Sequence, residues 1–397
     1  MATIISIFLY LGTIFFGFVL DSKTTSNKVR KYRLYFEVWL YVFLCFGYMT
    51  GSDWRSYEDI YDGSGAALLF YSNEPASAFL LHFAPSIIPD FWILLALLKC
   101  LYLYSSLKLA KYITKYWIST TAILIILCNS FMLIENPLRF MLGCIVINYI
   151  LLYLLKQYPN YSIRDFFIST ILVVVASLFH NTCVFFIVLF PICILAKRME
   201  RLNNNMLIVG YIIVLFVASS LNYIESIKVT IINLLLSGVE MKDYTTSGSY
   251  GDASSLLSIG NILKIIFFLL IIQYRNSITS GLHNGRFIFS LAVIYMYLER
   301  LLLLIPTGFR LSIPFCVFYG ACVSIMYFYN KRVISIFILY LGLSFAKNIW
   351  TSYEYLPYTN SIPYILSGHE SRSFREDYNL NAYKDRTGSD YIFQEYE

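Results

Sequence analysis

The chain has 397 residues, of which 58% are hydrophobic and only 14% are charged, with a formal net charge of +6. Soluble chains carry about 25% charged residues, so the composition excludes an ordinary soluble protein. The basic excess does not indicate nucleic acid, because the Lys and Arg residues sit in short loops between apolar blocks. We expect no nucleic-acid partner.

Apolar blocks recur from end to end, at roughly the length that crosses about 30 Å of hydrocarbon as a helix. The first block has no basic residue before it and no small-residue cleavage site, so it predicts a spanning helix and not a signal peptide. Twelve segments are predicted: 4–20, 34–50, 91–109, 117–133, 137–155, 166–179, 182–195, 207–221, 262–274, 287–304, 309–329 and 333–350. We therefore expect an all-α polytopic membrane protein with about twelve transmembrane helices and short outer amphipathic helices, forming a single transmembrane domain over 1–353.

The distribution of charge predicts the orientation of these segments. The loops expected inside (21–33, 108–115, 156–165, 197–205, 275–286 and 330–332) hold 17 of the 30 basic residues. Cytoplasmic loops are enriched in Lys and Arg, so we place both termini and the loops 51–90 and 222–261 outside. The segment 354–397 is predicted to be a polar, outward-facing tail. A single long helix over 166–195 would invert everything downstream, but the basic "AKRMER" that follows favours two crossings.

The stretch "GSDWRSYEDIYDG", residues 51–63, gathers four carboxylates, an arginine and three aromatic side chains just after an apolar segment. Trp54 and Tyr57 lie beside Asp53, Arg55 and Glu58 along the chain. Aromatic rings beside carboxylates suit a sugar, which has apolar C–H faces and a rim of hydroxyls. A solvated loop with interfacial aromatic residues fits the same pattern, and both interpretations stay open.

Several cations fall near the predicted outer ends of helices. Arg139 lies one turn into the segment 137–155, and Arg310 lies at the start of the segment 309–329. Arg300 follows Glu299 in the outer third of the segment 287–304. Charges inside a membrane are costly and are functional by default, and arginine binds phosphate oxygens in a bidentate manner. Arg139 and Arg310 are thus candidate phosphate ligands, whereas Arg300 is either a further ligand or a structural partner of Glu299 or Glu135.

His180 has both a structural and a functional interpretation. His180 stands in "SLFHNT", where two short apolar pieces meet; it is a hydrogen-bonded core residue or it lines a cavity at a break in the membrane helix.

The eight cysteines all lie in apolar segments without metal spacing and are expected to be small core residues. Lys264 and Lys347 are expected to be snorkelling anchors. The loop "IESIKVTIINLLLSG" predicts an amphipathic helix along the outer surface.

The ordered set of these motifs resembles the EpsG-type membrane proteins, relatives of the Wzy-class polymerases of O-antigen and capsule. "TGSDWRSYEDIYD", "NEPASAFLLHF", "NPLRFMLG", "VASLFHNT" and "GFRLSIPF" are similar to successive family elements, and "YLPY" is similar to the family's ending. The resemblance assigns Asp53, Glu74, Arg139, His180 and Arg310 to the family signature. Phe140 departs from it, since the family has glutamine there.

The resemblance implies a GT-C-like membrane glycosyltransferase that polymerises repeat units at the outer face of a bacterial cytoplasmic membrane. The substrates would be oligosaccharides on undecaprenyl diphosphate, with a Wzz-type chain-length regulator and a Wzx-type flippase as possible partners besides membrane lipid. Arg139, Arg310, Arg300, Arg55, Trp54 and Tyr57 would bind substrate; Asp53, Glu74, His180 or Glu299 would supply acid or base chemistry. No metal-ligand pattern is present, so we expect neither metal nor cofactor.

Two alternatives remain at this stage. An O-antigen ligase, or a glycosyltransferase that uses polyprenyl-phosphate sugars, would need the same outer acids and arginines. A lipid-linked oligosaccharide flippase would instead need cations near mid-membrane, of which the sequence offers essentially none by our segment assignment.

Overall fold

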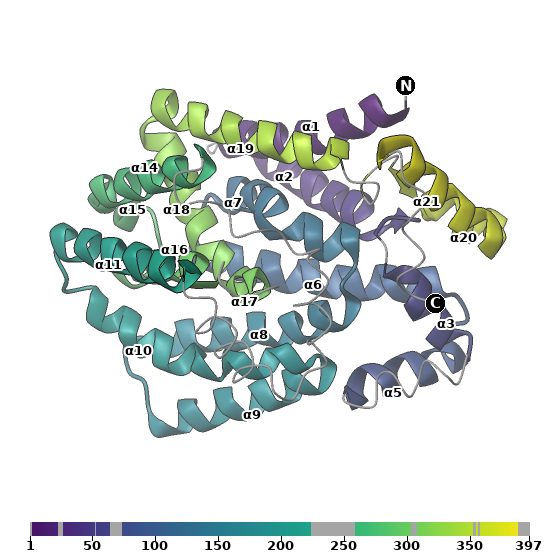
Figure 1. The fold of residues 1–397 in the computed structure, drawn as a ribbon, viewed down its shortest axis with the longest axis horizontal. Coiled ribbons are helices and arrows are strands. Elements are labelled where there is room, and N and C mark those ends of the chain that lie inside the picture. The colour runs from purple at the N-terminus through teal and green to yellow at the C-terminus, as the bar shows by residue number, and fades with distance from the viewer. Residues whose placement is uncertain are drawn as a thin grey trace.

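The computed structural model describes residues 2–22, 27–51, 53–63, 74–223, 259–302, 308–351, 355 and 358–387. This part of the chain is almost entirely helical (Figure 1). The predicted amphipathic helix of the loop 222–261 lies outside the described residues, which end at 223 and resume at 259.

The N-terminal half contains α1 (Ala2–Ser22), α2 (Asn27–Leu40), η1 (Tyr41–Cys45), β1 (Gly47–Tyr48), α3 (Trp54–Tyr61), α5 (Pro75–Phe83), η2 (Ala84–Ser86), α6 (Phe91–Ile113), α7 (Trp117–Leu124), η3 (Ile125–Asn129), η4 (Phe131–Glu135), α8 (Leu138–Gln157), α9 (Ile163–Phe179), η5 (Asn181–Val188) and α10 (Leu189–Met199). The C-terminal half contains α11 (Asn204–Tyr223), α14 (Ile259–Gln273), α15 (Arg275–Ser280), α16 (Gly285–Leu302), α17 (Phe309–Ser312), η6 (Ile313–Phe315), α18 (Cys316–Tyr329), α19 (Lys331–Thr351), β2 (Thr359–Asn360), α20 (Ile362–Ser367) and α21 (Arg372–Thr387).

Each of the twelve predicted segments carries helix, although several are built from consecutive pieces. Within the described ranges, five helices are long and apolar enough to cross a membrane: Ile4–Ser22, Phe91–Ile113, Leu138–Gln157, Asn181–Met199 and Phe309–Tyr329. Four shorter apolar helices accompany them: Trp117–Asn129, Asn204–Ser220, Asn261–Gln273 and Ile334–Trp350. The protein is therefore a multi-pass membrane protein, while the number of crossings stays a prediction.

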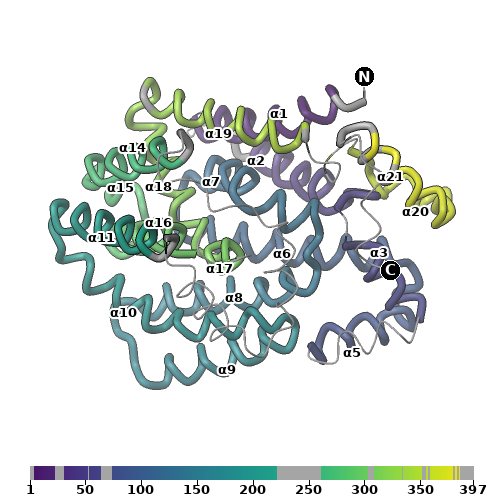
Figure 2. The backbone as a smooth tube through the Cα atoms, viewed as in Figure 1, coloured from purple at the N-terminus to yellow at the C-terminus, as the bar shows by residue number. Residues whose placement is uncertain are grey.

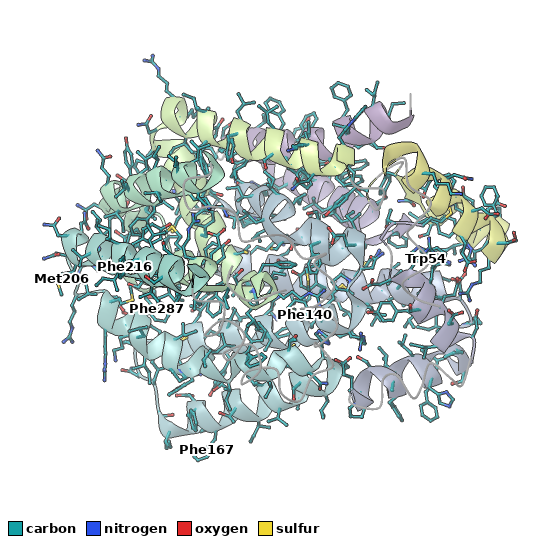
Figure 3. All side chains as sticks on the ribbon, in the orientation of Figure 1. Trp54, Phe140, Phe167, Met206, Phe216 and Phe287 are labelled. Carbon is teal, nitrogen blue, oxygen red and sulfur yellow. The ribbon has the colours of Figure 1, made fainter. Side chains whose placement is uncertain are left out.

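The outer surface of the helical bundle is apolar, as lipid requires. Figure 3 shows Phe167 and Met206 at the periphery. These two side chains and that of Phe216 are each more than half exposed. Phe140 and Phe287, in contrast, are fully buried. Soluble monomers rarely expose large contiguous apolar surfaces, so this exterior agrees with a membrane environment.

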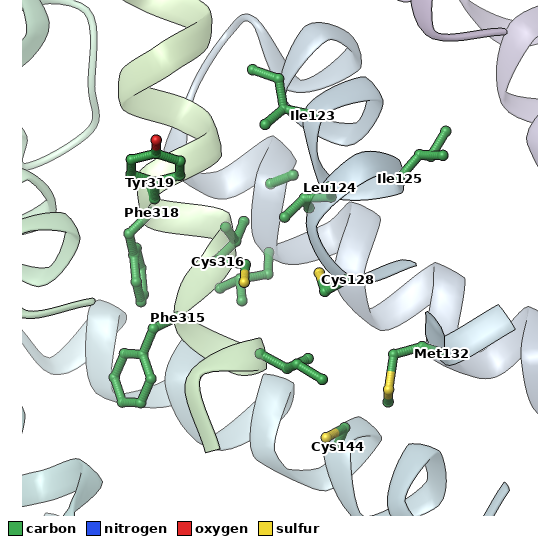
Figure 4. Close-up of a cluster of buried hydrophobic side chains, with 14 of the residues drawn as sticks. Ile123, Leu124, Ile125, Cys128, Met132, Cys144, Phe315, Cys316, Phe318 and Tyr319 are labelled. Carbon is green, nitrogen blue, oxygen red and sulfur yellow. The ribbon is translucent and has the colours of Figure 1, made fainter. Parts of the chain in front are cut away.

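The core contains the thiols, as expected. Seven of the eight cysteines are buried, Cys100 is partly buried, and all eight are free thiols. Figure 4 shows Cys128, Cys144 and Cys316 among leucine, isoleucine and phenylalanine side chains. These cysteines pack as small apolar groups.

Loops that are predicted to face inside meet at one end of the bundle. At one end the predicted inner loops contact one another: Thr114 forms a bridge with Leu282, and Arg275 donates to the carbonyl oxygens of Glu200 and Leu202. The helices α1, α8, α9 and α19 run roughly along the long axis of Figure 1, away from this end. Three of the loops predicted to face inside therefore meet at this end, while the alternation along the whole chain stays a prediction.

The opposite end brings the C-terminal segment back to the first outer loop. Strand β2 pairs antiparallel with β1, with Gly47 opposite Asn360 and Tyr48 opposite Thr359. In the same region Tyr358 and Asn360 donate to carbonyl oxygens of η1. Figures 1 and 2 show α20 and α21 at the same end of the bundle as α3 and α5. Part of the predicted polar tail therefore completes the backbone hydrogen bonding at the end of the second membrane segment.

The break at His180 divides the region 163–199 into two pieces that pack against each other. Helix α9 ends at Phe179, His180 is extended with φ −155° and ψ 122°, and η5 and α10 follow. Both η5 and α10 contact α9. The predicted break into two helical elements is therefore present, while the two crossings of the membrane stay a prediction.

Candidate functional site

Two loops at the predicted outer end of the bundle contact each other closely through their backbones. The Asn136 side chain donates to the carbonyl oxygen of Thr50 at 2.6 Å. Gly51 has φ +77°, and a Cβ at this position would lie 2.3 Å from the carbonyl oxygen of Glu135. Asn136 itself has φ 64°. Only glycine permits both the left-handed conformation and this close approach, so the sequence fixes how the loop after β1 meets the end of η4.

This contact brings Glu135 close to the charges of Asp53 and Arg310. The Tyr355 hydroxyl donates to the Glu135 carboxylate at 2.5 Å. Burial raises the pKa of Glu135, and the negative charge of Asp53 raises it further, whereas the bond from Tyr355 and the charge of Arg310 oppose the shift. Asp53 is exposed at the N-cap position of α3. Two carboxyl groups from separate loops thus interact beside an arginine.

Glu74 forms the centre of the second half of the site. It precedes Pro75, which begins α5, and its side chain is buried. One carboxylate oxygen accepts from Arg139 Nη1 at 2.5 Å. The other lies 2.5 Å from His180 Nδ1 and accepts from the backbone N–H of Asn181 at 3.1 Å. A single carboxylate therefore joins α5, α8 and the break between α9 and η5.

The electrostatics of this group set the tautomer of His180. Burial alone would raise the pKa of Glu74, but the hydrogen bond and charge of His180, the charge of Arg139 and the Asn181 amide together lower it. Burial lowers the pKa of His180, against the pull of Glu74, and Arg139 and Arg310 add to the lowering. An ionised Glu74 beside a neutral imidazole requires the proton on Nδ1. Nε2 is then left as an acceptor, and it has no hydrogen-bond partner among the described residues.

Local packing holds His180 in this position. The Ser77 hydroxyl donates to the carbonyl oxygen of Phe179 at 2.8 Å, which ties α5 to the end of α9. The Phe140 ring meets the imidazole edge-on with 5.6 Å between the centroids. Phe140, which stands where the resembling family has glutamine, therefore supports His180 by an apolar contact.

Arg139 and Arg310 differ in how their charges are compensated. Arg139 forms the ion pair with Glu74. The guanidinium of Arg310 lies 5.7 Å from the Phe131 ring centroid, and no carboxylate among the described residues lies within ion-pair distance of it. Its charge acts on both His180 and Glu135. Arg310 is thus the cation that leaves more of its binding capacity for an anionic ligand.

The aromatic residues of the first outer loop are buried. Trp54 is 0% exposed and Tyr57 is 3% exposed. The Trp54 ring packs against Trp92 and lies near the guanidinium groups of Arg55 and Arg375, at 5.5 Å and 5.3 Å. Trp54 and Tyr57 therefore have a packing role here. Their contact with a sugar, and that of Arg55 with a substrate, stay predictions.

Two predicted site residues form a separate group. Glu299 pairs with Lys264 at 2.6 Å, which gives this expected anchor a carboxylate partner. Arg300 is buried and donates to Tyr211 and to Asn261, at 3.1 Å and 2.5 Å. Of the described residues, neither Glu299 nor Glu135 forms an ion pair with Arg300, so the alternative that one of them is its structural partner is wrong, and Tyr211 and Asn261 take that place. Glu299 and Arg300 are not brought to Glu74.

Sequence reasoning missed several members of this region. Glu135 was considered only as a partner for Arg300, although its place before "NP" at the end of an apolar segment marks it as an outer-end acid. Tyr355 and Arg375 carried no local signal, and Glu58 was noted only as one of the acids of the stretch 51–63. Lys99 lies in α6, nine positions after the N-cap residue Asp90, and it is fully buried near the middle of this helix. The count of essentially no mid-membrane cation was therefore incorrect.

The fold and the site define a multi-pass helical membrane protein with carboxylates, a histidine and arginines gathered at one end. The EpsG family model matches residues 31–365, so the chain belongs to the EpsG family. This match confirms the resemblance drawn from the motifs. Membership of this family points to a membrane polysaccharide polymerase-type protein. No curated protein and no solved structure gave a significant match.

Proposed function

We propose that this protein polymerises polyprenyl-diphosphate-linked oligosaccharide repeat units by glycosyl transfer. The observation that carries the proposal is the Glu74–His180 pair beside Arg139 and Arg310, at the end of the bundle where the acidic loop lies. It combines a histidine positioned for base chemistry with fixed positive charge, and family membership supports the same reaction class.

The leaving group accounts for the arginines. Attack of an acceptor hydroxyl on the anomeric carbon forms a new C–O bond and breaks the bond to the diphosphate oxygen, which departs with the electron pair. Preorganised donors aimed at developing negative charge stabilise such a transition state. Arg310 would hold the diphosphate, and Arg139, already paired with Glu74, would contribute a second guanidinium at the edge of the site.

The acceptor hydroxyl needs a base, because it must lose its proton as the bond forms. We assign this role to His180 Nε2. Glu74 would fix the tautomer and stabilise the imidazolium that results, as a carboxylate does behind a catalytic histidine. The proton would then leave His180 for the released diphosphate or for water. Asp53 and Glu135 would hold the incoming sugar or Arg310, and Glu299 has no role in this arrangement.

We place the reaction at the outer face of a bacterial cytoplasmic membrane. The basic loops at the opposite end of the bundle support this orientation through the positive-inside rule. A diphosphate at the membrane surface would keep its lipid tail in the bilayer and its sugar in water. A flippase and a chain-length regulator would supply the substrate and limit the product.

The test is polymerisation of purified lipid-linked repeat units by the purified protein. The proposal predicts a ladder of longer glycans together with released polyprenyl diphosphate. Transfer of a preformed polymer to a different acceptor, without elongation, would instead identify a ligase.

A further inference from the structure

The C-terminal helix α21 is attached to α3 by an ion pair that is almost entirely buried. Arg375 Nη1 lies 2.7 Å and 2.9 Å from the two carboxylate oxygens of Glu58. The two side chains are 8% and 7% exposed. Burial raises the pKa of Glu58, and the hydrogen bond and charge of Arg375 oppose this shift. A buried pair of this kind is costly to form and more costly to break from one side.

The same guanidinium contacts the aromatic residues of the outer loop. Its central carbon lies 5.3 Å from the Trp54 ring centroid and 5.6 Å from that of Trp92. A planar guanidinium can stack on aromatic rings while it donates to a carboxylate, and a lysine cannot reproduce both contacts. Arg375 therefore fixes the position of α3 from the side of the C-terminal segment.

Helix α3 lies between the two halves of the candidate site. Its N-cap residue is Asp53, whose charge acts on Glu135. It also contacts α5, which begins directly after Glu74. A shift of α3 would therefore move Asp53 relative to Glu135 and alter the support of Glu74 at the same time.

We propose that Arg375 is a positioning residue of the site: through Glu58, Trp54 and Trp92 it holds α3 where Asp53 meets an incoming saccharide unit. The C-terminal segment then forms part of the acceptor side of the site. The saccharide part of this inference rests on the proposed function. The mechanical part, that Arg375 holds α3, does not.

The mechanical part is tested by hydrogen exchange of the detergent-solubilised full chain, followed by mass spectrometry of peptides covering residues 54–61. Arg375→Ala should speed amide exchange in α3, and Arg375→Lys should have a smaller effect. The charge-swap variant, Glu58→Arg combined with Arg375→Glu, should recover part of the protection against hydrogen exchange. Arg372→Ala is the matched control, because Arg372 pairs with Asp59 on the same two helices but is more than one-third exposed. Unchanged exchange of α3 in Arg375→Ala would overturn the inference.

The functional part is tested with the same variants in polymerisation of lipid-linked repeat units. Arg375→Ala should lower kcat/KM roughly tenfold, mainly through KM for the acceptor, within the range seen for coupled neighbours. The charge-swap variant should recover part of the lost kcat/KM, and Arg372→Ala should match the wild type. If α3 loosens but KM and kcat stay normal, or if activity only follows the amount of folded protein, Arg375 is structural and the proposal fails. If the wild type does not polymerise at all, the proposed function fails, while the exchange data still decide whether Arg375 holds α3.

Discussion

The Glu74 carboxylate lies 2.5 Å from His180 Nδ1, although the two residues are 106 positions apart in the chain. The pair forms because α5 is tied to the end of α9 through Ser77 and Phe179. It orients the imidazole so that Nε2 remains as an acceptor. The base chemistry of the proposed reaction depends on this relationship.

Replacing the base should remove most of the activity. His180→Gln keeps a polar side chain but cannot accept and release a proton, so we expect a rate loss of about 10² to 10⁴, the usual contribution of general base catalysis. The measurement is the initial rate of glycan elongation. His82→Gln, on the exposed side of α5, is the control and should elongate normally. Near-normal elongation by His180→Gln would transfer the base role to Asp53 or Glu135.

The pH dependence follows from the direction of the His180 shift. Burial lowers the pKa of His180 below its ordinary value of about 6.5. As the pH falls through this lowered pKa, Nε2 becomes protonated and the base is lost, so activity should persist at pH 6.5 and decline only in more acidic buffer. The acid limb of kcat/KM measures this. A limb centred above pH 6.5 would show that His180 is not the neutral base.

The contact between Gly51 and Glu135 should tolerate no side chain. Gly51→Ala places a Cβ 2.3 Å from the Glu135 carbonyl oxygen at a left-handed position, so the two loops must separate and the rate of elongation should fall well below that of the wild type. Gly63→Ala is the control, since Gly63 also has positive φ but has no described atom within 4 Å of the added Cβ. It should cost only about 1–2 kcal/mol of backbone strain. Polymerisation and thermal unfolding, measured on the same preparations, separate the two effects.

The orientation can be tested at exposed positions on opposite ends of the bundle. Ser373→Cys on α21 should react with an impermeant thiol reagent added to intact cells, and Asn160→Cys, between α8 and α9, should react only after the membrane is opened. The native cysteines are mostly buried, which keeps the background low. Labelling of Asn160→Cys from outside would reverse the assignment of faces.

Long apolar runs could be located from the sequence because burial in lipid demands an unbroken hydrophobic stretch, and each such run carries helix. Short outer helices were expected, but the positions of α3 and α5 were not predicted, since both are short and their stability comes from tertiary contacts. The region of Glu74, Arg139, His180 and Arg310 was predicted through the family motifs, whereas their mutual contacts were not. Glu135 contacts Tyr355, which is 220 positions away, and Arg375 contacts Glu58, which is 317 positions away. No local sequence pattern indicates contacts between residues so far apart. Trp54 was expected at a ligand surface, but the guanidinium of Arg375 and the Trp92 ring cover it.

The ion pair between Glu74 and Arg139 leaves Arg310 as the main candidate to hold the diphosphate. Lysine at position 310 would keep the charge but lose the planar fork, and loss of one preorganised donor typically costs about 10² to 10³ in rate. The most direct measurement is therefore in vitro elongation of purified lipid-linked repeat units by Arg310→Lys, compared with the wild type and with Lys347→Arg as a control at another outer-end cation. We predict a rate loss on the order of 10² or more for Arg310→Lys and normal elongation for the control; wild-type elongation by Arg310→Lys would contradict the role of Arg310 as the diphosphate ligand.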